Sequence, residues 1–123
     1  VWISIRYQRV NIFERDENGK WDLIKCCIVG TGASNTPTPV GVWKTTYKQK
    51  AWITDTYIVK PIVRFRAGSG LAFHSRLFNP GSGTWLIDSR IGFPISHGCI
   101  RMYDEDVQWM YNNIPSGTTV VSY

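Results

Sequence analysis

A cysteine and a histidine lie two positions apart in residues 95–102, with a glycine between them. A thiol becomes a reactive nucleophile when a neighbouring base or cation lowers its pKa, and histidine is a common partner. Gly98 lets the backbone approach a substrate closely and direct N–H groups at developing negative charge. We therefore predict that Cys99 is the centre of an acyl-transfer site.

The chain contains two histidines, and either could serve Cys99. If residues 97–99 are extended, the side chains of His97 and Cys99 point to the same face. His74 lies far upstream and can approach only through the fold, which is usual for a catalytic pair. The spacing alone leaves the choice between them open.

Zinc binding is the competing chemistry for these three side chains. A structural zinc site takes four protein ligands, usually with a CxxC pair, and the chain has no such pair. A catalytic zinc needs three ligands and stays open as an alternative. The glycine pairs, such as Gly30 and Gly32, form neither a phosphate-binding loop nor a dinucleotide fingerprint. We expect no metal and no cofactor.

The net charge of +5 is concentrated around the histidines and Cys99. Residues 60–101 contain one acid, Asp88, against six bases: Lys60, Arg64, Arg66, Arg76, Arg90 and Arg101. This excess favours an anionic substrate or surface.

The length of 123 residues fits one domain, and the aromatic and glycine content favours a mainly β fold. No apolar run approaches the ~20 residues of a membrane helix, and no signal peptide opens the chain. We expect residues 1–123 to be a single domain excised from a longer secreted or membrane-anchored protein. Of the adjacent cysteines, we expect one of Cys26 and Cys27 in the core and the other partly exposed, because a disulfide between them would be strained.

Local patterns predict the order of the elements. Strands are predicted over residues 2–7, 10–13, 21–29, 42–47, 52–57, 58–65, 72–75 and 118–123. Asn18 and Gly19 predict the turn of an N-terminal hairpin, and residues 77–93 are predicted to be irregular. Apolar residues at helical spacing after Asp104, the predicted N-cap, indicate one short helix that ends at Pro115.

The run Ser96-His97-Gly98-Cys99-Ile100-Arg101 resembles the signature of the L,D-transpeptidase catalytic domain (YkuD-type). His74, at the end of a predicted strand, resembles the upstream histidine of that family. The Gly30 loop and Thr38-Pro39-Val40-Gly41 are similar to its Gly…Thr-Pro-x-Gly segment. The chain departs from the family pattern in a longer interval between His74 and Ser96, which predicts an enlarged loop over residues 77–92, and in Ser75, where many members have glycine.

The resemblance implies a mixed β-sandwich with a groove leading to the site, and peptidoglycan stem peptides as both donor and acceptor. Cys99 would attack the carbonyl of the third residue of a tetrapeptide, release D-Ala and form a thioester. An amine from a neighbouring stem would then complete a 3→3 cross-link. The resemblance also implies an extracytoplasmic bacterial enzyme of cell-wall biogenesis that carbapenem β-lactams inhibit. It implies no nucleic-acid partner and no membrane contact by the domain itself.

Within this interpretation His74 is the first choice of general base, with the Ser75 carbonyl orienting its ring. His97 is the second choice and more naturally shapes the site. The N–H groups of Gly98 and Cys99 would form the oxyanion hole, worth on the order of 3 kcal/mol per donor lost. A hydroxyl at Ser96 would hold the motif in place.

Arg101 has two possible roles in this interpretation. It could bind a substrate carboxylate or brace the loop, or it could form a salt bridge toward the acidic residues 104–106 at the predicted helix start.

Other functions remain open at the level of sequence. A cysteine peptidase or sortase-like enzyme would also use Cys, His and Arg, but on all-L peptides, and water as acceptor would give an L,D-carboxypeptidase. A non-catalytic wall-binding module would leave Cys99 with the ordinary thiol pKa of ~8.5.

Overall fold

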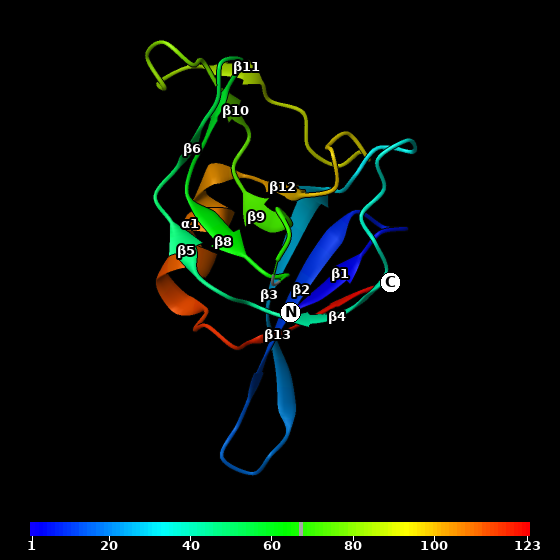
Figure 1. Cartoon of the computed structure of the whole chain (residues 1–123). Helices are drawn as coiled ribbons and strands as arrows, with labels where there is room; N and C mark the ends of the chain where they lie inside the picture. The colour runs from blue at the N-terminus through cyan, green and yellow to red at the C-terminus, as the bar shows by residue number, and fades with distance from the viewer. Residues whose placement is uncertain (67) are drawn as a thin grey trace.

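Two β-sheets build the fold in the computed structural model, which describes residues 1–66 and 68–123. The nine-stranded sheet has the spatial order β4 (Gly41–Lys44), β13 (Thr119–Ser122), β1 (Trp2–Ser4), β2 (Arg9–Arg15), β3 (Trp21–Gly30), β12 (Ile100–Met102), β9 (Ala72–His74), β8 (Ile62–Arg64) and β5 (Lys48–Gln49). The four-stranded sheet has the order β11 (Leu86–Asp88), β10 (Leu77–Phe78), β7 (Ile58–Val59) and β6 (Trp52–Ile53). One helix, α1 (Asp104–Asn113), is present in the described residues (Figure 1). The mainly β fold with a short C-terminal helix is confirmed.

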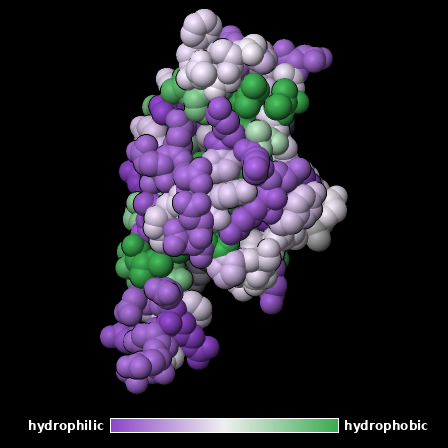
Figure 2. Space-filling view, turned by 90° about the vertical axis from the view of Figure 1, so that its left-hand side faces the viewer, coloured by the Kyte–Doolittle hydropathy of each residue, from purple (hydrophilic) through white to green (hydrophobic). Residues whose placement is uncertain are grey.

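The N-terminal meander β1–β2–β3 follows the alternation in the sequence. Ile3, Val10 and Ile12 are buried, while the intervening side chains face outward. Gly19 adopts a φ of 80° in the turn between β2 and β3, which explains the glycine at this position. The distal part of this hairpin extends beyond the sheet as an arm (Figure 1), and its tip is hydrophilic (Figure 2).

The central strands β9 and β12 are covered on both faces. Phe73, Ile100 and Met102 pack with Val107 and Met110 of α1 on one face. On the opposite face Cys99 packs against a smaller cluster of Val59, Ile62 and Ala72, which joins the two sheets. Because alternate side chains of a strand point to opposite faces, the residues on the Cys99 side lie between the large sheet and the smaller one.

The expectation of irregular structure over residues 77–93 is wrong. Leu77–Phe78 and Leu86–Asp88 pair as the antiparallel strands β10 and β11, and β10 also pairs with β7. These strands are short and their register shifts between Leu77 and Phe78, so no alternating pattern marks them in the sequence. The enlarged loop therefore contains a hairpin at the edge of the four-stranded sheet.

Other boundaries also differ from the prediction. The strands predicted over residues 42–47, 52–57 and 58–65 are shorter segments, and residues 58–65 are divided between the two sheets. Asp104 is the first residue of α1 rather than its N-cap; Tyr103 occupies that position without a side-chain cap. The acidic first turn instead complements the helix dipole.

Cys27 is buried and Cys26 is exposed, as expected, and burial raises the pKa of Cys27 to about 12. In the ranges 1–66 and 68–123, no helix is long and apolar enough to cross a bilayer.

Candidate active site

The strands β9 and β12 are parallel neighbours, and this pairing assembles the site. Phe73 is paired with Ile100, and His74 is paired with Arg101. Cys99 immediately precedes β12 and packs against Ile62, the β8 partner of His74, and Ala72, so it lies on the face of the sheet that His74 occupies. The pairing therefore brings the distant His74 to the Ser96–Arg101 segment, diagonally across from Cys99 on one face of the sheet.

Cys99 is partly buried, and its thiol donates a hydrogen bond to the Gly70 carbonyl at 3.2 Å. Burial raises the pKa of Cys99, while a backbone hydrogen bond from Ala72 and the positive charge of Arg64 act in the opposite direction. The resting thiol is thus protonated at neutral pH. A protonated thiol can act as a nucleophile only where a base removes its proton during attack.

His74 is 7% exposed, and its Nδ1 lies 2.7 Å from the Ser75 carbonyl oxygen. A carbonyl oxygen can only accept, so Nδ1 carries the proton and Nε2 is left as an acceptor. Burial lowers the pKa of His74 to about 4; the Ser75 hydrogen bond opposes this shift and the charge of Arg101 adds to it. The ring is therefore neutral at pH 7 and is held in the tautomer that a general base requires.

His97 is exposed, and its segment is not extended. Residues 97–99 form a bend in which Gly98 has a φ of 123°, a conformation that other residues rarely adopt. The condition under which His97 and Cys99 would share a face is not met. Closeness in sequence is therefore no indication that His97 serves the thiol.

Ser96 closes this bend with its hydroxyl. Its Oγ donates to the Cys99 carbonyl at 2.5 Å and accepts the Gly98 N–H at 3.1 Å. The hydroxyl thus holds the motif, as we expected. The Gly98 N–H, expected to point at an oxyanion, is occupied by Ser96 in this conformation.

The loop between β3 and β4 supports the bend from outside. Thr38 Oγ1 donates to the Gly98 carbonyl at 2.7 Å and accepts the Gly32 N–H at 2.9 Å. Thr36 Oγ1 donates to the Ser96 carbonyl at 2.8 Å. A Cβ on Gly32 would lie 2.1 Å from the Thr36 carbonyl oxygen, so a glycine is required there. The roles of Thr36 and Thr38 were missed from sequence; the only signal was the resemblance of residues 38–41 to a family segment.

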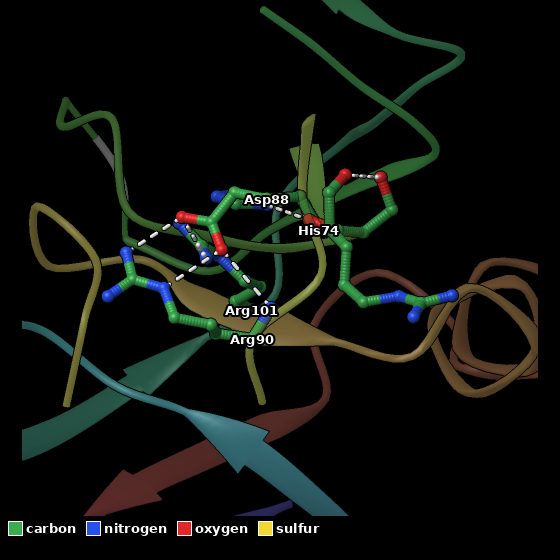
Figure 3. A network of polar contacts seen from close by, with 6 residues as sticks. His74, Asp88, Arg90 and Arg101 are labelled. Carbon is green, nitrogen blue, oxygen red and sulfur yellow. Dashed lines mark hydrogen bonds and ion pairs between the residues drawn. The ribbon is translucent and has the colours of Figure 1, made fainter. Parts of the chain in front are cut away.

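Arg101 is 4% exposed and forms an ion pair with Asp88, with Nη1 3.1 Å from Oδ2. The same carboxylate binds the exposed side chain of Arg90, through Nε at 3.0 Å and Nη2 at 2.8 Å. Figure 3 shows Asp88 between the two guanidinium groups, with His74 beside Arg101. The ion pairs hold the pKa of Asp88 well below its usual range, most strongly through Arg90. Sequence reasoning missed Asp88, which had only its charge as a signal.

The alternative salt bridge from Arg101 toward residues 104–106 is wrong. Asp104 pairs with Arg76 and Asp106 pairs with Lys25, whereas Arg101 points to the opposite face of β12 from the residues that pack on α1. The parallel pairing fixes this direction, because His74 and Arg101 must share a face.

Two cavities lie elsewhere on the molecule. One of about 720 Å³ is lined by Val1, Trp2, Phe13, Trp21, Thr118 and Thr119. The other, of about 340 Å³, is lined by Lys50, Lys60, Pro61, Phe78, Asp104, Gln108 and Tyr111. Neither lining contains Cys99 or His74, so the groove expected at the site stays a prediction. Within the described ranges, no group of three His, Cys, Asp or Glu side chains is placed to hold a metal ion.

A β-sandwich that joins a buried histidine to a Ser-His-Gly-Cys bend defines the class of protein. The family model of the L,D-transpeptidase catalytic domain (YkuD) matches residues 1–121, and the chain belongs to this family. It is 29% identical over 96 residues to a probable L,D-transpeptidase 3 of Mycobacterium tuberculosis. The matched region covers 73% of this chain and 35% of the relative.

Solved structures agree with this assignment. A fused Zn-dependent amidase/peptidase/peptidoglycan-binding domain-containing protein from Clostridium acetobutylicum superposes with a TM-score of 0.80 at 33% identity, over 99% of this chain and 50% of that chain. An L,D-transpeptidase in complex with imipenem has the same fold, with a TM-score of 0.74 at 19% identity, over 99% of this chain and 57% of the other. The chain thus spans between about a third and a little over half of the length of these relatives.

Proposed function

We propose that this domain is a cysteine-dependent transpeptidase that forms 3→3 peptidoglycan cross-links through a thioester on Cys99. The observation that carries the proposal is the parallel pairing of β9 with β12, which brings a buried, neutral imidazole to the face of the sheet that holds the thiol. Membership of the L,D-transpeptidase family supports the substrate class.

In the first half-reaction, His74 Nε2 takes the proton of Cys99 Sγ as the sulfur attacks the carbonyl carbon of the third residue of a donor tetrapeptide. The carbonyl π electrons move to oxygen, and the Cys99 backbone N–H, the donor of the bend that Ser96 does not occupy, stabilises the resulting oxyanion. When the intermediate collapses, the C–N bond to D-Ala breaks, and the D-Ala nitrogen takes the proton back from the imidazolium. The products are a thioester and free D-Ala.

In the second half-reaction, an amine of an acceptor stem loses a proton to His74 Nε2 and attacks the thioester carbon. The C–S bond breaks, the Cys99 thiolate leaves, and the imidazolium returns a proton to it. Two thiol-mediated steps thus replace one direct amide exchange. If water replaces the amine, the same chemistry yields an L,D-carboxypeptidase.

The roles of the remaining residues follow from their positions. Ser75 orients His74, Ser96 holds the bend, and Gly98 provides its conformation. His97, which is the exposed first residue of the bend, shapes the entrance to the thiol. Because Arg101 is buried and paired with Asp88, its contribution is to brace the site, while the basic surface attracts the carboxylates of the stem peptides. Such substrates place the domain outside the cytoplasm.

Intact-mass analysis after exposure to a carbapenem tests the nucleophile. A carbapenem is a suitable probe because an L,D-transpeptidase of the same fold is known in complex with imipenem. We expect one adduct on the wild-type protein and on Cys26→Ser, and none on Cys99→Ala. An adduct that persists in Cys99→Ala would overturn the proposal. Release of D-Ala from a tetrapeptide, with no cleavage of an all-L peptide, would separate this activity from that of a cysteine peptidase.

A further inference from the structure

Asp88 belongs to the small sheet but reaches the catalytic segment of the large one. It ends β11 and is paired with Leu77 of β10, whose side chain packs in the cluster that includes Cys99. Its carboxylate contacts Arg101 of β12 at 3.1 Å. The Asp88–Arg101 ion pair is thus a charged link between the two sheets at the site (Figure 3).

The Arg101 guanidinium depends on the Asp88 carboxylate because its other surroundings offer few hydrogen-bond partners for its buried N–H groups. Among the described residues its Nε and Nη1 atoms are buried without a hydrogen-bond partner, so Nη1 meets Asp88 as an ion pair rather than as an aligned hydrogen bond. A buried guanidinium without a counter-ion is strongly unfavourable. Asp88 supplies the negative charge that makes this burial possible.

The groups packed around His74 make Arg101 important for its chemistry. Trp52 comes from β6 with its ring centroid 6.2 Å away and Arg64 of β8 over its ring, while Ile62 of β8 and Arg101 of β12 are paired with His74. The charge of Arg101 acts on the imidazole and opposes its protonation, whereas the charge of Arg64 acts on Cys99. An imidazolium forms at His74 in each half-reaction, so a bare Arg101 cation would disfavour both steps.

We propose that Asp88 is a positioning residue of the site, which holds the Arg101 guanidinium in place and offsets its charge so that His74 can accept the thiol proton. This inference rests on the proposed role of His74 as base. It assigns a function to the hairpin β10–β11: the hairpin delivers a counter-ion to the catalytic segment.

Arg90 provides a matched control on the same carboxylate. Its guanidinium binds Asp88 from the exposed side, and no contact joins it to His74 or Arg101 in the described structure. Asp88 keeps its partner Arg101 when Arg90 is replaced. Arg90→Gln should therefore leave the reaction nearly unchanged, whereas Asp88→Asn should impair it.

The kinetic test is the rate of Cys99 acylation by imipenem as a function of pH. For Asp88→Asn we expect a plateau lower by up to about tenfold, the limit for the loss of one pKa unit of basicity, and an acidic limb displaced to lower pH. Asp88→Glu should stay within about threefold of wild type, and Arg90→Gln within about twofold. A purely structural role would not displace the acidic limb.

Measuring Asp88→Asn with and without Arg101→Gln separates a charge effect from a general loss of folding. In an Arg101→Gln background the cation is gone, so adding Asp88→Asn should change the rate by less than about twofold. An equal loss in both backgrounds, or no loss in either, would refute the proposal.

The ring-proton NMR titration of the histidines gives a readout that does not require activity. Only two histidines are present, and His97→Gln assigns the signals. Asp88→Asn should move the His74 titration to lower pH, and an unmoved titration would contradict the inference. If the wild-type protein is not acylated at all, the proposed function fails, while the titration still decides the effect of Asp88 on His74.

Discussion

His74 and Arg101 are paired residues on the neighbouring parallel strands β9 and β12, and their side chains share one face of the large sheet. This relationship places the neutral imidazole of His74 and the buried cation of Arg101 in the same small region as the thiol of Cys99, the residue before β12. The imidazole is oriented by its own neighbour Ser75, and the cation is balanced by Asp88 from the other sheet.

Replacing His74 should affect acylation far more than replacing His97. His74→Ala removes the only buried imidazole in the described structure, and loss of a general base lowers rates by roughly 10²–10⁴-fold. His97→Ala alters an exposed side chain and should cost less than about tenfold. The measurement is the rate of carbapenem adduct formation on Cys99. A larger loss in His97→Ala than in His74→Ala would reverse the assignment of the base.

The stability of the domain should fall as the pH is lowered from 7 toward 4. The unfolded chain binds a proton at His74 near the ordinary pKa of ~6.5, whereas burial lowers the folded pKa to about 4. Between these values the unfolded state holds more protons, and the free energy of unfolding decreases by on the order of 3 kcal/mol.

Urea unfolding at pH 5, 6 and 7 checks this slope, with His74→Gln expected to flatten it and His97→Gln expected to retain it. Titration of Asp88 does not interfere between pH 5 and 7. Because its pKa is lowered in the folded state, Asp88 stabilises the fold fully above its unfolded pKa of ~3.9, and this stabilisation is lost only at lower pH. A slope that survives in His74→Gln would assign it to other groups.

Thr38→Val should destabilise the domain and slow acylation together. Valine has the shape of threonine but leaves the Gly32 N–H and the Gly98 carbonyl without their buried partner. An unpaired buried polar group costs about 1–3 kcal/mol, and here the loss falls on the bend that presents Cys99. Thr56→Val is the control, because Thr56 is exposed and bonds only weakly to Thr54. Equal unfolding free energies for the two variants would show that Thr38 does not support the bend.

Gly32→Ala should be more damaging than Gly70→Ala. A Cβ at position 32 would lie 2.1 Å from the Thr36 carbonyl oxygen and 2.6 Å from the Thr38 nitrogen, so the backbone of the loop must shift. Nothing lies within 4 Å of a Cβ at position 70. Overpacking typically costs about 1–3 kcal/mol, and thermal denaturation of the two variants compares it directly. Matching melting temperatures would contradict the close approach at Gly32.

Short-range features were predictable because their signals lie within a few residues. The hairpin turn at Asn18 and Gly19, the helix after Tyr103 and the core position of one of the adjacent cysteines all depend on local spacing or local conformational preference. The hairpin β10–β11 was missed because its strands are short, irregular in register and stabilised by pairing with β7. Asp88 was missed for the same reason: its partner Arg101 is adjacent only after two sheets have packed together.

The sequence by itself determined the nucleophile candidate, because the side-chain types of the Ser-His-Gly-Cys run specify that local chemistry; the bend at residues 97–99 was decided by the structure. The sequence left open which histidine could serve the thiol and what Arg101 does. The tertiary structure decided where these side chains lie: the parallel register of β9 and β12 places His74 on the face of Cys99, leaves His97 exposed, and turns Arg101 toward Asp88 and away from α1. Such pairings between distant strands depend on which apolar faces must be buried together, and that is a property of the whole chain rather than of any one segment.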